Sequence, residues 1–174
     1  MRKLLILFVF AAITLSSCKQ ATNQNPAGLT IEEMTDILTS QKWRYDVDQV
    51  QKGLDEVKSK IPPGQYEIVS KAIQRVQFGT FEFTKDNTIW LDLANGSSPS
   101  QGTWVFSPEG DYLVITFSTT KAVPHPIEKF SKDEIYLGAN LEAGAIYPKV
   151  FIPLSEGSGI ITRDTVDTTN TSEQ

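Results

Sequence analysis

The feature that most constrains the fold is a series of short apolar–polar alternations that begins at Phe78. Their period of two residues is typical of β-strands with one buried face. Turn-forming stretches such as Lys85–Asn87 and Pro108–Gly110 separate neighbouring segments. We place seven strands here, at 78–84, 88–93, 102–107, 111–118, 127–131, 134–138 and 145–154.

One further strand and three helices are predicted before Phe78. Residues 42–48 alternate apolar and charged side chains, so we place the first strand there. Thr30 and Glu33 fit a capping box that opens a helix ending near Ser40. Apolar residues at helical spacing predict two more helices, separated by a Pro-Pro-Gly stop. These two helices lie at 51–60 and 65–76.

The number and spacing of the strands predict how they pair. Short connections favour antiparallel neighbours. Eight such strands can close by pairing the first with the last, which removes both sheet edges. We therefore predict a mainly β fold, an eight-stranded antiparallel up-and-down barrel over residues 29–154. An N-terminal helix precedes it, and a helical insertion at about 49–77 joins its first two strands.

The N-terminus has the organisation of a secretory signal. A basic start at 1–3 precedes the apolar run 4–15, the small residues Ser16 and Ser17, and then Cys18. A membrane-spanning helix is the alternative reading, but the run is shorter than the roughly 20 residues that a bilayer needs. Export is therefore the stronger interpretation.

The sequence Leu15-Ser16-Ser17-Cys18 also resembles the lipobox of bacterial lipoproteins. The resemblance implies a signal peptide at 1–17, a lipid on Cys18, and membrane attachment through that lipid. Residues 18–28 then form a flexible tether, and residues 155–174 a mostly disordered acidic tail. Because Lys19 is neither the Asp of an inner-membrane retention signal nor the start of an acidic run, we expect the outer membrane, facing the periplasm.

Four short motifs resemble those of bacterial lipocalin-like lipoproteins. They are Gln41-Lys42-Trp43, the F-x-F-x-x-D-G-T-like run Phe81–Thr88, Gly102-Thr103-Trp104, and the hairpin Ile127–Ile135. Two positions depart from that pattern, since Gln41 and Asn87 stand where the family has glycine. The resemblance implies a lipocalin-like barrel on the membrane.

The residues that would support catalysis or metal binding are few. The chain has one Cys and one His, so it offers no disulfide within the chain and no cysteine-based zinc site. His125 lies between two prolines without a sequence-adjacent carboxylate, and we interpret it as a loop-edge residue without a chemical role. We predict no catalytic residue, no metal, no cofactor and no enzyme activity. The net charge of −5 argues against a nucleic-acid partner.

Aromatic side chains are concentrated on the predicted strands. They are Trp43, Tyr45, Phe81, Phe83, Trp90, Trp104, Phe106 and Phe117. They can line a pocket for a small hydrophobic or amphipathic molecule, with Trp43, Phe83 and Trp104 as candidate ligand-binding residues. They can equally fill the barrel, because eight strands leave little room inside. A filled barrel would favour a structural protein of the cell envelope that docks a protein partner.

Overall fold

The computed structural model describes residues 25–117 and 121–155. The helices are α1 (Ile31–Thr39), α2 (Val47–Val57), the 3-10 turn η1 (Lys58–Lys60) and α3 (Pro63–Arg75). The strands are β1 (Lys42–Tyr45), β2 (Thr80–Phe83), β3 (Thr88–Asp92), β4 (Ser100–Phe106), β5 (Tyr112–Phe117), β6 (Val123–Phe130), β7 (Ile135–Leu137) and β8 (Lys149–Pro153).

The eight strands form one closed antiparallel barrel in chain order. Each strand pairs with the next, and β1 also pairs with β8 through Trp43↔Pro153 and Tyr45↔Phe151. This closing ladder leaves neither end strand with a free edge. The predicted barrel, its N-terminal helix and the helices between the first two strands are confirmed.

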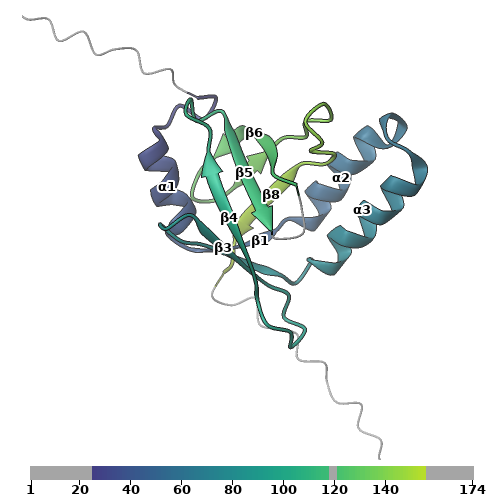
Figure 1. Ribbon diagram of the computed structural model, residues 1–174, viewed down its shortest axis with the longest axis horizontal. Coiled ribbons are helices and arrows are strands. Elements are labelled where there is room, and N and C mark those ends of the chain that lie inside the picture. Colours follow the sequence, from purple (N-terminus) through teal and green to yellow (C-terminus); the bar gives the residue numbers. More distant parts are fainter. Residues whose placement is uncertain (1–24, 118–120, 156–174) are drawn as a thin grey trace, which may run out of the picture.

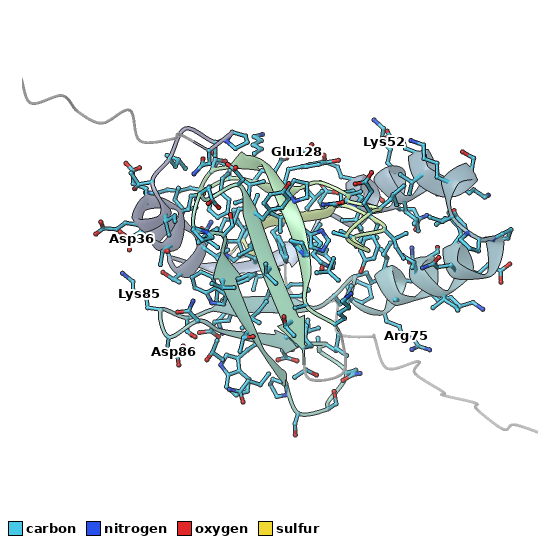
Figure 2. The ribbon with its side chains drawn as sticks, turned by 45° about the horizontal axis from the view of Figure 1, so that its top comes forward. Asp36, Lys52, Arg75, Lys85, Asp86 and Glu128 are labelled. Atoms are coloured by element: carbon cyan, nitrogen blue, oxygen red, sulfur yellow. The ribbon has the colours of Figure 1, made fainter. Side chains whose placement is uncertain are left out.

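Helix α1 covers one end of the barrel (Figure 1). The capping box between Thr30 and Glu33 is present, and Met34 and Leu38 point into the core with no exposed surface. An exposed ion pair of 2.7 Å joins Asp36 of α1 to Lys85 in the β2–β3 turn, and Figure 2 shows the two side chains reaching toward each other. Helix α1 is thus held to the barrel by its apolar face, with a polar link at its rim.

The first strand is shorter than predicted. It ends at Tyr45, and α2 begins at Val47 rather than at Gln51. The side chain of Asp46 explains the difference because it accepts a hydrogen bond from the backbone N–H of Gln49 and caps the helix. The alternation through residue 48 was therefore misread as strand.

Helices α2 and α3 lie side by side on the opposite side of the barrel from α1 (Figure 1). Pro63 occupies the first turn of α3, where a missing amide donor costs nothing. Helix α2 also approaches the chain before β8, because the ring of Pro148 stands where a side chain on Gly53 would be. The insertion is therefore packed against the barrel wall at that point.

Strand β6 is longer than predicted, because it begins at Val123 and includes both prolines. Pro124 and Pro126 pair across from Val114 and Tyr112 of β5. The Pro126 carbonyl accepts a bond from Gly138, on the side away from β5. In an antiparallel strand the nitrogen of a residue faces the same side as its carbonyl, so these prolines remove no donor from the β5–β6 ladder.

Two further boundaries differ from the expectation. Strand β8 begins at Lys149 instead of Ala145, because Ala145 pairs with Asn140 in a small turn of its own. At the other end, the Asn25 side chain is buried and donates to the Leu29 carbonyl at 2.6 Å. The packed chain therefore includes residues 25–28, the last part of the predicted tether.

Candidate functional site

The three predicted ligand-binding residues lie in the packed aromatic interior. Trp43, Phe83 and Trp104 are each at most 3% exposed. The indole N–H of Trp43 donates to the Leu38 carbonyl at 2.9 Å, and that of Trp104 donates to the carbonyls of Thr84 and Thr88. The backbone therefore satisfies the indole donors of both tryptophans. None of the three residues lines the cavity described next.

A cavity of about 290 Å³ opens at the barrel end beneath α3. Most of its lining is apolar, and it is contributed by α3, by strands around the barrel and by the chain before β8. The lining residues are Tyr45, Ala72, Val76, Phe81, Leu91, Ile115, Phe117, Lys121, Val123, His125, Gly144, Ala145, Ile146, Tyr147, Lys149 and Phe151. The barrel is therefore not completely filled at this end.

Three aromatic rings from neighbouring strands form the floor of the cavity. Tyr45 lies 4.7 Å from Phe81 and 4.9 Å from Phe151, measured between ring centroids. Phe151 also contacts Phe83 edge-to-face at 5.7 Å. Since Phe83 in turn packs on Trp104, the floor is continuous with the filled part of the barrel.

The amine of Lys149 and the hydroxyl of Tyr45 place polar groups at this floor. Lys149 of β8 is half-buried, and its Nζ donates to the Tyr45 hydroxyl at 3.2 Å. The same ammonium lies 4.8 Å from the Tyr147 ring centroid, within cation–π range. Burial alone would lower the pKa of Lys149, but its contacts with Tyr45 and Tyr147 raise that pKa above its usual value. Burial raises the pKa of Tyr45, so the phenol is protonated at neutral pH.

His125 is part of the cavity wall, which corrects its interpretation as a loop-edge residue. It is 4% exposed, and its Nδ1 lies 3.2 Å from the Gly138 carbonyl. Because a carbonyl only accepts, Nδ1 carries the proton and Nε2 is left as an acceptor. Burial, and next the charge of Lys149, lower the pKa of His125 from 6.5 to about 3. The ring is therefore neutral at physiological pH.

The lining of the cavity combines apolar surface with a few polar side chains. Its lining contains no nucleophile placed beside a base and no carboxylate. Among residues 25–117 and 121–155, no three His, Cys, Asp or Glu side chains gather in a way that could hold a metal ion. In the same ranges, no helix combines the length and the apolarity that crossing a bilayer requires.

The polar cavity residues Lys149 and His125 were missed because the candidate pocket lining comprised aromatic side chains alone. The signal was nevertheless present in the strand period. His125 shares a face with the inward Ile127, and Lys149 shares one with the inward Phe151. Tyr45 and Phe81 were among the aromatic candidates, whereas Trp90, another of them, is 38% exposed.

Comparisons with known proteins add a likeness of fold. No family model matches the chain, and no curated protein matches it. Among solved structures, it is similar to a DUF4847 family protein from Bacteroides vulgatus ATCC 8482, at 14% identity and a TM-score of 0.39. That match covers 67% of this chain and 94% of the other. The site is therefore interpreted from its own residues.

Proposed function

We propose that this protein is a membrane-anchored, non-catalytic, lipocalin-like lipoprotein that binds a small hydrophobic or amphipathic molecule in its barrel. The observation that carries the proposal is the apolar cavity of about 290 Å³ beneath α3. Its volume is close to the lower limit of about 300 Å³ for ligand pockets, which are apolar with a few convergent polar groups. Tyr45, His125 and Lys149 supply such groups here.

The shape of the lining favours capture of an apolar chain. Leu91, Ile115 and Val123 present hydrocarbon surface from three different strands, and Val76, directly after α3, adds to it. Transfer of an apolar group from water onto such surface is favourable by roughly 25 cal/mol per Å² buried. Taking about 30 Å³ as the space of one water molecule, the cavity has room for roughly ten heavy atoms. The ligand is accordingly small.

The place of action that we propose is the membrane surface. The lipobox-like sequence ending at Cys18 supports lipid attachment, and the tether would hold the barrel near the outer membrane on its periplasmic side. Residues 1–24 lie outside the described part of the chain. Labelling of cells with a radioactive fatty acid tests this part, with incorporation expected in the natural chain and lost in Cys18→Ser.

Ligand binding is tested by blocking the cavity. Val76→Trp places an indole over the cavity, whereas Val105→Trp makes the same change at an exposed position on the outer face of β4. Native mass spectrometry of the full chain purified from its membrane should show a co-purifying small molecule in the natural protein and in Val105→Trp, and none in Val76→Trp. Absence of any such molecule, together with failure to bind added amphiphiles, would contradict the proposal.

A second candidate function is docking of an envelope protein on the helical insertion. Ile68 of α3 and Phe78 after it are each 70% exposed, which is unusual for large apolar side chains. If they form a docking surface, a pull-down from envelope extract should retain a defined partner that Ile68→Glu loses and Val105→Glu keeps. Equal recovery with both variants would exclude this surface.

A further inference from the structure

The charged side chains of the cavity are all basic. Its lining includes Lys121 and Lys149 and no Asp or Glu. The chain as a whole is acidic, with 21 Asp and Glu against 16 Lys and Arg. A cavity whose charge is opposite to that of the whole protein is not explained by overall composition, and it points to the ligand.

The contacts of the Lys149 ammonium within the described chain are with two tyrosines and with no carboxylate. The ammonium lies against Tyr45 and Tyr147, but phenols are neutral at physiological pH and leave its positive charge uncompensated. The ion pairs among the described residues join other lysines to carboxylates, at Lys42, Lys85 and Lys129. A half-buried cation without a carboxylate is costly unless a counter-charge arrives from outside.

We infer that the ligand is a single-chain amphiphile whose apolar tail occupies the cavity and whose carboxylate binds Lys149. This inference rests on the binding function proposed above and specifies the class of its ligand. The Lys149 ammonium supplies the charge-assisted hydrogen bond to one carboxylate oxygen. The Tyr45 hydroxyl accepts from Lys149, so its own proton is available to donate to the second oxygen.

The rest of the cavity fits the tail of such a molecule. Ile115, Phe117 and Val123 form apolar wall on β5 and β6, across from the β8 side chains. His125 is neutral because burial lowers its pKa, so it adds no charge to the cavity. Lys149 is the half-buried cation of the lining, whereas Lys121 is exposed, so one negative charge at the end of one apolar chain matches the interior of the cavity.

The inference is tested by measuring the affinity of the full chain for three probes with the same tail. Decanoate is anionic, decanol is neutral and decyltrimethylammonium is cationic, and each is titrated calorimetrically near neutral pH. We expect decanoate to bind at least about ten-fold more tightly than decanol, and the cationic probe to bind least. Lys149→Met should reduce decanoate affinity to that of decanol.

A matched control removes the same charge outside the cavity. Lys52 lies on the exposed side of α2, and its side chain points to solvent in Figure 2. Lys52→Met should therefore bind decanoate as the natural protein does. If Lys52→Met and Lys149→Met lower decanoate affinity equally, the effect is one of net charge and the inference is overturned.

The outcomes separate this inference from the proposed function. If decanoate and decanol bind equally in the cavity, the protein binds apolar molecules but Lys149 does not select their head group. If none of the three probes binds, the inference and the proposed function both fail. Should Lys149→Met not fold, Tyr45→Phe provides the second variant, since it removes only the hydroxyl. We expect Tyr45→Phe to bind decanoate several-fold more weakly than the natural protein does and to bind decanol with unchanged affinity.

Discussion

The two ends of this barrel are built from the same strands but are filled differently. At the end under α1, Met34, Leu38 and Trp43 are entirely buried and pack against the interior rings. At the end under α3, the lining leaves a cavity of about 290 Å³ with Lys149 and His125 in its wall. One end is therefore filled by side chains, and the other leaves a cavity.

The difference shows that aromatic side chains fill one end of this barrel and form only the floor of a cavity at the other. Eight strands enclose a space that side chains just fill or that holds one small ligand. The rings of Phe83, Trp104 and Phe106 stack edge-to-face through the filled region. The helix insertion then covers the other opening, where shorter side chains such as Val123 and Ala145 leave space.

The largest effect that tests this comparison is expected at the α1 end. Trp43→Ala should lower the free energy of unfolding by about 3–5 kcal/mol, because it opens a core cavity and frees the Leu38 carbonyl. Trp90→Ala is the matched control on the outer face of β3, with an expected loss below about 1 kcal/mol. Urea unfolding measures both. Similar losses would show that the α1 end is not the stabilising one.

An effect of comparable size concerns His125 and pH. Its pKa lies at about 3 in the folded protein and near 6.5 when unfolded, so the unfolded state takes up the proton first as the pH falls. Stability from this residue is complete above pH 6.5 and is lost toward pH 3, by about 1.4 kcal/mol per pH unit.

The protonation state of His125 can be measured directly, because the chain has one histidine. Its imidazole Hε1 NMR signal should not titrate between pH 8 and pH 5. A midpoint near 6.5 would mean that the ring is solvated, and it would contradict the buried position of His125 in the cavity wall. In His125→Gln, the stability loss on acidification should be smaller than in the natural protein.

A smaller effect is expected from the cap of α1. Thr30→Ala removes the side-chain oxygen that accepts from the Glu33 backbone, and this should cost about 1 kcal/mol. Thr35→Ala in the middle of the same helix is the control, because alanine has the higher helix propensity. The urea midpoints should fall for the first variant and not for the second. An equal fall would show that the cap contributes nothing.

The smallest effect on stability is expected at the open end. Lys149→Met replaces a half-buried charge by an apolar side chain of similar length, so the free energy of unfolding should change by less than about 1 kcal/mol or rise. Thermal unfolding followed by circular dichroism measures it. A loss as large as that of Trp43→Ala would mean that Lys149 is a structural residue and not one held ready for a ligand.

Most of the barrel could be predicted because its strands alternate and its turns carry suitable residues. The Lys85–Asn87 turn is an example, where Asn87 adopts a positive φ of 65° that asparagine tolerates better than most residues. The boundaries were less predictable, since Val47 fits both the strand pattern and the helix that Asp46 caps. The prolines of β6 were misread as flanking residues because their orientation depends on the register with β5.

The cavity could be predicted only in part. The strand period places Lys149 beside Phe151 on the inward face, and this much follows from spacing. Whether space remains around them depends on the balance of side-chain volumes and on where α3 lies. Neither can be predicted from a local sequence pattern. Tyr45 illustrates the limit, since its hydroxyl meets the Lys149 ammonium only because β1 pairs with β8 in the closed barrel.

The most direct test of the central claim locates the bound molecule within the barrel. With methyl groups labelled for NMR, contacts between the protein and bound decanoate can be assigned to either end. The account predicts nuclear Overhauser effects to Ile115 and Val123, which line the cavity, and none to Met34 or Leu38 under α1. Contacts to Met34 and Leu38, or to neither pair, would contradict it.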